Sequence, residues 1–113
     1  MKITCDKTKL IEALSLGQRA LSPNSTLEAI KGYLIQGTEE GISVSSYNLE
    51  TGIVTTIPAT SVAGESIVIN GRILFDIIRR LPEDTLSIEV NEKGVAVIRS
   101  GNSEFNIMTL PAQ

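Results

Sequence analysis

The stretch IVINGRILFDII, residues 67–78, repeats the pattern of ITCDKTKLIEAL, residues 3–14, and this repetition decides the fold. Each stretch begins with alternating apolar residues, which are typical of a β-strand, and continues with apolar residues at helical spacing. Asp6 and Asn70 fall at the same point of the two stretches, and both residue types favour the start of a helix. The sequence therefore predicts two strand–helix units, in which Ile3 corresponds to Ile67 and Asp6 to Asn70.

A second match extends the repeat beyond the helices. EEGISV at 39–44 lies over EKGVAV at 92–97, and IVTTIPA at 53–59 lies over NIMTLPA at 106–112, both at one common offset. This offset is smaller than the offset between the two strand–helix stretches. The difference arises because the two halves differ in length between the helix and the next strand, where loops absorb insertions. The chain is thus one strand–helix–three-strand unit used twice, with hairpin turns at Glu40–Gly41, Lys93–Gly94 and Gly101–Asn102.

Local signals predict the bounds of each element. The helix after Asp6 covers KTKLIEALSLGQRAL, residues 7–21, and the helix after Asn70 stops at Pro82, because proline cannot continue a helix. Strands are predicted at 1–5, 29–36, 42–47, 51–57, 66–70, 85–90, 94–100 and 103–110. Two such units, related by a pseudo-twofold axis, place both helices on one face of a joined antiparallel sheet. This is an α+β architecture in a single domain, residues 1–113.

The composition is that of a soluble globular protein, with 42% hydrophobic and 20% charged residues. No apolar run approaches the ~20 residues of a membrane span, so no membrane association is predicted. No signal peptide precedes the first strand, which favours a cytoplasmic location. The single cysteine, Cys5, lies in an apolar alternation and is expected to be a small core residue.

Enzyme chemistry finds little support in the sequence. The chain has no histidine, which excludes serine and cysteine hydrolase triads and histidine-ligated metal sites. It also has no glycine-rich phosphate loop. The adjacent acids Glu39–Glu40 and Glu83–Asp84 lie beside turn signals, where solvated carboxylates are ordinary. We therefore predict no catalytic residue, no metal site and no cofactor.

Three arginines lie on the second helix of a chain whose net charge is −3. At about 100° per residue, one side of this helix carries Arg72, Asp76, Arg79 and Arg80, and the rest carries Ile73, Leu74, Phe75, Ile77, Ile78 and Leu81. One interpretation is a solvated face with the ion pairs Arg72–Asp76 and Asp76–Arg80. The other is a basic surface, shared with Lys9 and Arg19 of the first helix, that contacts phosphates without reading bases.

Four segments carry a family resemblance: MKITCDKTKLIEAL at 1–14, YNLETGI at 47–53, NGRILFDIIRRLPED at 70–84 and VIRSGNSEFNIMTLPA at 97–112. Together they resemble the first domain of the bacterial sliding clamp, the beta subunit of DNA polymerase III. The resemblance covers essentially the whole chain in order. It implies a DNA-clamp domain that forms the N-terminal third of a three-domain protomer.

The resemblance also implies a function. In this family two protomers close into a ring around duplex DNA, with helices lining the channel, and serve DNA replication as a polymerase processivity factor. Such a clamp is not itself a DNA-directed DNA polymerase or other nucleotidyltransferase. The implied partners are double-stranded DNA, bound non-specifically, and a second protomer. Polymerase and clamp loader bind the full-length protein only, in a pocket between its second and third domains.

The resemblance assigns DNA-binding roles to Arg72 and Arg79, which fall on basic positions of the second helix. Arg80 has no firm counterpart in the family, but it adjoins Arg79 on the same side of the helix. Asn24 stands where many clamps carry an arginine that touches DNA. Its amide can reach a phosphate, but it brings no charge.

The last strand is implied to form the protomer interface. Phe105 and Ile107 match apolar positions that pack against the partner's third domain, and being two residues apart they point to the same face. The other interpretation is that both residues fill this domain's own core. A second class of function also remains open, namely a protein-interaction module that pairs through the edges of its sheet and has no DNA role.

Overall fold

Asp6 and Asn70 begin the two helices in the same way. The Asp6 carboxylate accepts a hydrogen bond from the backbone N–H three residues later (3.1 Å), and the Asn70 side chain does the same (3.0 Å). Each bond satisfies one of the backbone donors that a helix leaves open at its start. Helix α1 (Lys7–Gly17) and helix α2 (Gly71–Arg79) therefore begin at equivalent positions of the repeat, as the sequence predicts.

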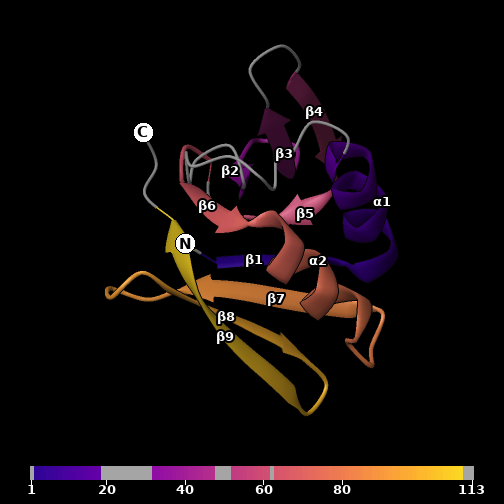
Figure 1. Ribbon diagram of the computed structural model, residues 1–113, viewed down its shortest axis with the longest axis vertical. Helices are drawn as coiled ribbons and strands as arrows, with labels where there is room; N and C mark the ends of the chain where they lie inside the picture. The colour runs from indigo at the N-terminus through magenta and orange to yellow at the C-terminus, as the bar shows by residue number, and fades with distance from the viewer. Residues whose placement is uncertain (1, 19–31, 48–51, 62, 111–113) are drawn as a thin grey trace.

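The computed structural model describes residues 2–18, 32–47, 52–61 and 63–110 (Figure 1). It is an α+β domain in which all strand pairs are antiparallel. The strands within these ranges are β1 (Lys2–Asp6), β2 (Gly32–Gly37), β3 (Ile42–Tyr47), β4 (Gly52–Ile57), β5 (Ala59–Thr60), β6 (Ser66–Asn70), β7 (Thr85–Val90), β8 (Val95–Ser100) and β9 (Ser103–Leu110).

The element bounds confirm the duplication. At the offset that pairs Asp6 with Asn70, β6 has the same bounds as β1, and α2 begins where α1 begins. At the offset that pairs Gly41 with Gly94, β7 and β8 have the same bounds as β2 and β3, and β9 ends where β4 ends. The two offsets inferred from the sequence therefore hold for every one of these elements.

The two halves exchange their first strands. β1 pairs with β7 of the second half, and β6, its counterpart, pairs with β2 of the first half. Even the register repeats, because Ile3 lies opposite Ile88 and their counterparts Ile67 and Ile35 lie opposite each other. The pseudo-twofold relation predicted from the sequence is thus built into the hydrogen-bonded sheet.

The sheet runs in the order β4-β3-β2-β6-β9-β8-β7-β1-β5. Each helix follows directly on a first strand and packs back on the sheet, α1 against β1, β3 and β4, and α2 against β2 and β6. The helices also pack against each other, and Figure 1 shows them together on one side of the sheet. Both predicted helices therefore lie on the same face, as expected.

One difference separates the halves. Ile42 of β3 lies opposite Ile57, whereas its counterpart Val95 lies opposite Met108, two residues short of the position that the repeat gives. A two-residue turn causes the shift, with Gly101 at a positive φ of 57°. Because the shift is two residues, every side chain keeps its face. Strand β9 consequently runs past β8, and its last residues pair with β6.

Sequence reasoning missed β5, a two-residue strand after Pro58 that pairs with β1. It occupies the place in the first half that the end of β9 occupies in the second. The predicted helix over 7–21 ends earlier, since α1 stops at Gly17 and residues 19–21 lie outside the described part of the chain. The predicted strand over 29–36 begins at Gly32 as β2, and residues 29–31 lie outside the described part as well.

One apolar core serves both halves. Its fully buried side chains come from both helices and from strands of each half: Ile3, Leu10, Leu14, Tyr33, Ile35, Ile42, Ile69, Leu74, Ile78, Leu86, Ile88 and Ile98. Cys5 belongs to this core, as predicted, and burial, with a smaller effect of the Asp6 charge, raises the pKa of its thiol to about 12. The Tyr33 hydroxyl donates a hydrogen bond to the Leu14 carbonyl and so ties β2 to α1.

Gly17 lies beside the contact between Tyr33 and α1, so a substitution at Gly17 probes how closely β2 packs on this helix. Alanine has a higher helix propensity than glycine, by about 1 kcal/mol. However, a Cβ at position 17 would lie 2.6 Å from the Tyr33 ring and 3.0 Å from the Ser46 hydroxyl oxygen, and both side chains are fully enclosed. We expect Gly17→Ala to lower the free energy of unfolding by about 1–3 kcal/mol through overpacking. Ser15→Ala, at an exposed position of the same helix, is the control and should be neutral or slightly stabilising in urea unfolding.

Cys5 makes stability depend on pH. The folded thiol keeps its proton up to about pH 12, whereas an unfolded thiol releases it near pH 9. Between these values the unfolded state binds fewer protons, so stability falls as pH rises, by up to about 1.4 kcal/mol per pH unit. Cys5→Ala should make the decline between pH 9 and 11 shallower in urea titrations. Equal slopes for the two proteins would contradict this assignment.

Candidate nucleic-acid interface

The side chains of α2 divide between core and solvent. Leu74 and Ile78 are fully buried, and because they lie four residues apart, they turn one side of the helix to the core. Arg72, Arg79 and Arg80 are exposed. The structure thus brings the three predicted arginines to the solvent side of a single short helix.

Two details of the predicted helix are wrong. Ile73, expected on the apolar side, is 47% exposed, so an isoleucine adds apolar surface beside Arg72. Within the described part of the chain, neither Arg72–Asp76 nor Asp76–Arg80 forms an ion pair. Spacing of four residues brings such side chains near each other, but an exposed pair gains too little to hold them together. The guanidinium groups of Arg72 and Arg80 are therefore not held by Asp76.

Arg79 has a partner of a different kind. Its guanidinium carbon lies 5.4 Å from the centroid of the Phe75 ring, one turn earlier on α2. Such cation–π contacts are attractive because the face of the ring is electron-rich. Phe75 is half-buried and packs against the core, so its ring gives the Arg79 side chain a fixed support.

The first helix extends this surface. α1 lies against α2, and its Lys9, Glu12 and Leu16 are exposed. The first helix thus adds one positive, one negative and one apolar side chain to the surface, as the sequence suggests. Arg19 and Asn24, which were predicted to add a cation and a polar contact, lie outside the described residues, so their roles stay predictions.

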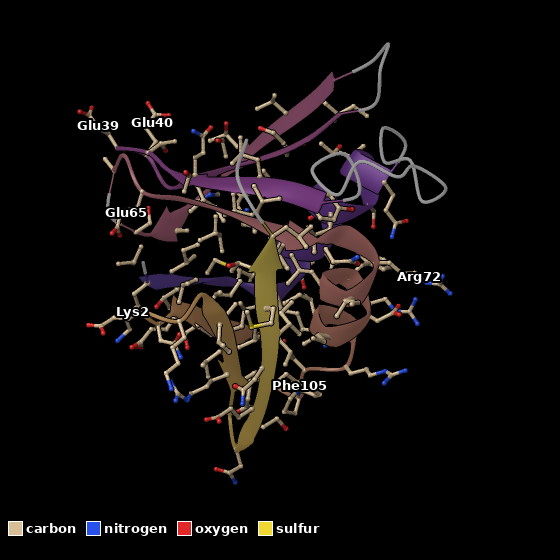
Figure 2. The ribbon with its side chains drawn as sticks, turned by 60° about the vertical axis from the view of Figure 1, so that its left-hand side comes forward. Lys2, Glu39, Glu40, Glu65, Arg72 and Phe105 are labelled. Atoms are coloured by element: carbon tan, nitrogen blue, oxygen red, sulfur yellow. The ribbon has the colours of Figure 1, made fainter. Side chains whose placement is uncertain are left out.

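Three of the acidic residues lie away from Arg72. Figure 2 shows Glu39, Glu40 and Glu65 on the opposite side of the molecule from Arg72. Glu39 and Glu40 belong to the turn between β2 and β3, and Glu65 directly precedes β6. These three carboxylates therefore do not neutralise the arginines, although Asp76 of the same helix and Glu83 and Asp84 just after it lie near them in the sequence.

The predicted interface residues lie on β9. Phe105 and Ile107 are half-buried and pack against the core cluster, whereas Glu104, Asn106 and Met108 are exposed on the other face. The alternation predicted from the sequence is confirmed. The structure places both apolar side chains against this domain's core, and their half-exposure leaves apolar surface for a second contact.

Among the described strands, none covers the outer edge of β9 over most of its length. Within the part of the chain that the structure describes, β9 pairs with β8 from Ser103 to Met108, and on its other side it pairs with β6 at Thr109 and Leu110. Strand β4 lies at the end of the sheet, and none of its residues is charged. Glu104 of β9 forms an ion pair with Arg99 of β8 at 2.9 Å, which the sequence did not reveal.

The described residues do not meet the requirements of a metal site, a reactive thiol or a membrane-spanning helix. They contain no group of three or more His, Cys, Asp or Glu side chains able to hold a metal ion. The one thiol is enclosed in the core. Among the helices that the structure describes, none has the length and apolar character needed to cross a membrane.

One further residue of the site escaped the sequence reasoning. Lys7, the first residue of α1, donates a hydrogen bond from Nζ to the Leu81 carbonyl just beyond α2 (2.6 Å). The two residues are 74 positions apart, so no local pattern announces the contact. Only knowledge that the two helices lie together could have suggested it.

Comparison with known proteins identifies the family. Residues 1–113 match the family described as DNA polymerase III beta subunit, N-terminal domain. The chain is 30% identical to the beta sliding clamp of Micrococcus luteus over 111 residues, covering 98% of this chain and 36% of that protein. It is 31% identical to the beta sliding clamp of Bacillus subtilis over 120 residues, covering 99% of this chain and 32% of that protein. The chain thus spans about a third of the length of these relatives.

Solved structures agree in fold. The crystal structure of the DNA polymerase sliding clamp from Bacillus subtilis superposes with a TM-score of 0.92 at 30% identity, over 97% of this chain and 31% of that one. The DNA polymerase III subunit beta from Pseudomonas aeruginosa gives a TM-score of 0.88 at 26% identity, over 99% and 31%. Family, relatives and fold therefore agree: the chain belongs to the family of the N-terminal domain of the DNA polymerase III beta subunit, the bacterial sliding clamp.

Proposed function

We propose that this chain is the first of three clamp domains in a protomer, and that two such protomers form a ring around duplex DNA. In that role it is a non-catalytic processivity factor of DNA replication, and it acts in the cytoplasm. The observation that carries the proposal is the exposed set Arg72, Arg79 and Arg80 on one helix of a family member with acidic residues on its far side.

The arginines suit non-specific contact with DNA. Guanidinium groups bind phosphate oxygens, and contacts to phosphates carry no sequence information. With few phosphate contacts per domain, the affinity for DNA stays low and each contact can exchange from one phosphate to the next. A ring that slides along DNA requires both properties. Enclosure of the duplex by the ring, and not tight binding, would keep the clamp on DNA. We propose Asn24 as a further polar contact from the segment after α1.

Ring closure is proposed to use β9. No described strand pairs with the outer edge of β9 from Ser103 to Met108, so a strand of a second protomer can add to the N–H and C=O groups that point outward there. Phe105 and Ile107 would then pack on both the domain's own core and the partner. Polymerase and clamp loader would bind other domains of the full-length protein.

A second candidate function follows from the same edges. β4 lies at a sheet end without a single charged residue, and natural proteins usually protect such edges with charges, prolines or coverage. A module that only pairs with other proteins through β4 and β9 would show this feature and would not bind DNA. The dependence of DNA binding on salt separates the two candidates.

DNA binding should be weak, independent of sequence and sensitive to salt. Two or three phosphate contacts imply a log–log salt slope of about −2 to −3, and hence an affinity loss of about ten- to fortyfold between 50 and 200 mM salt. Arg72→Glu should make the slope shallower by about one and leave the melting temperature nearly unchanged, because exposed charges contribute little to stability.

Lys2→Glu is the matched control for this experiment. It makes the same change in charge at an exposed residue that Figure 2 shows on the opposite side of the molecule from Arg72. It should leave the slope unchanged in fluorescence anisotropy titrations with a short duplex. Sequence-selective binding, or an affinity that does not respond to salt, would contradict the proposal.

Phe105→Ala should weaken ring assembly in the full-length protein. The half-buried ring also packs on the core, so the variant should lose about 1–2 kcal/mol of stability, less than a fully buried phenylalanine loses. Sedimentation should show a shift from dimer to monomer. Ile88→Val provides a core control, because its side chain is buried in β7, away from the open edge of β9. A dimer as stable as wild type in Phe105→Ala would show that Phe105 acts only in the core.

A further inference from the structure

The end of α2 decides where two of the three arginines point. Arg79 is the last helical residue, and Arg80 is the C-cap, with φ −92° and ψ −3° and no glycine to close the helix. The final carbonyls of a helix have no partner within it, and unsupported ends fray. Phe75 supports the Arg79 side chain from within the helix, but the backbone that carries Arg79 and Arg80 depends on what holds the residues that follow.

Lys7 holds these residues from the other half of the domain. Its Nζ donates a hydrogen bond to the Leu81 carbonyl at 2.6 Å, and its backbone N–H donates one to the Asp84 carbonyl at 2.7 Å. An ammonium group at the C-terminal end of a helix is favourable, because the open carbonyls carry partial negative charge. The bond is charge-assisted and half-buried, and both properties strengthen it.

The same segment is held from two further sides. The Leu81 side chain is 2% exposed in the core, and the Ser100 hydroxyl oxygen accepts a hydrogen bond from the Glu83 N–H at 3.1 Å. Lys7 is the contact that reaches the carbonyl immediately after Arg80. The other helix is closed differently, since hydroxyl groups of Tyr33 and Ser46 donate to carbonyls at the end of α1.

We propose that Lys7 is a positioning residue of the DNA-binding surface. It acts through Leu81 to fix the last turn of α2, so that Arg79 and Arg80 face the phosphates, while its own ammonium donates a hydrogen bond to the carbonyl. Arg72, at the start of α2 beside the Asn70 cap, does not depend on Lys7. This inference rests on the proposed DNA-binding function.

Amide exchange tests the contact without DNA. The Arg80 and Leu81 N–H groups donate to the Ile77 and Ile78 carbonyls, so they report the last turn of α2 directly. Lys7→Met keeps the length of the side chain and removes the donor. Exchange at both amides should become about tenfold faster by NMR, and exchange at Leu74 in the middle of the helix should not change. Lys7→Arg should restore slow exchange.

A titration with a short duplex at about 50 mM salt tests the consequence. In the wild type, the side-chain Nε–H signals of all three arginines should shift on adding DNA. In Lys7→Met the dissociation constant should rise about three- to tenfold, the shifts of Arg79 and Arg80 should shrink, and that of Arg72 should remain. Lys2→Met, which removes the same charge on the side opposite Arg72, should behave as wild type.

The other outcomes separate the alternatives. If Lys7→Met weakens binding but keeps the Arg79 and Arg80 shifts, Lys7 is itself a phosphate contact and the positioning role is wrong. Unchanged amide exchange would equally overturn it. If no arginine of the wild type responds to DNA, the proposed function fails, whatever the exchange data show. Should Lys7→Met not fold, Lys7→Ala, which also removes the donor and keeps a high helix propensity, takes its place with the same expected results.

Discussion

The fold depends on one constraint, which is that the first strand of each half pairs along its whole length with a strand of the other half. β1 finds its hydrogen-bond partner in β7, and β6 finds its partner in β2, in the same register. Since each helix follows its first strand without an intervening loop, this exchange also fixes where the helices lie. They meet on one side of the sheet, and their solvent sides become a single surface. The arginines, the contact from Lys7 and the separation from the acidic turns all follow from that placement.

Much of this architecture could be predicted from the sequence because its signals are local. The caps at Asp6 and Asn70, the alternation in the strands and the two repeat offsets each depend on neighbouring residues, and the structure confirms them. Contacts between residues far apart in the sequence produce no such local signal. The Lys7–Leu81 bond and the tie between Tyr33 and α1 need the tertiary fold before they can be recognised. β5 was missed for the same reason, since only pairing with β1 makes two residues after Pro58 a strand.

The candidate site shows a similar division. Residue type and helical spacing were enough to place Arg72, Arg79 and Arg80 on the solvent side of α2. They were not enough to place Ile73, because the boundary of a helix face depends on what the neighbouring elements cover. Alternation also gave the inward direction of Phe105 but could not say whether its contacts are internal or external. A half-buried residue at a strand edge can serve both a core and a partner.

Strand exchange also governs the order in which the chain can fold. β1 leaves the ribosome before the other strands of this domain, but β7, with which it pairs along its whole length, begins at Thr85, so β1 must wait until most of the domain has been made. Contacts between residues so far apart close large loops and slow folding. A nascent first half can form the β2–β3–β4 hairpins, but it exposes the edge of β2 until β6 arrives. The two halves are therefore alike in structure without being units that fold separately.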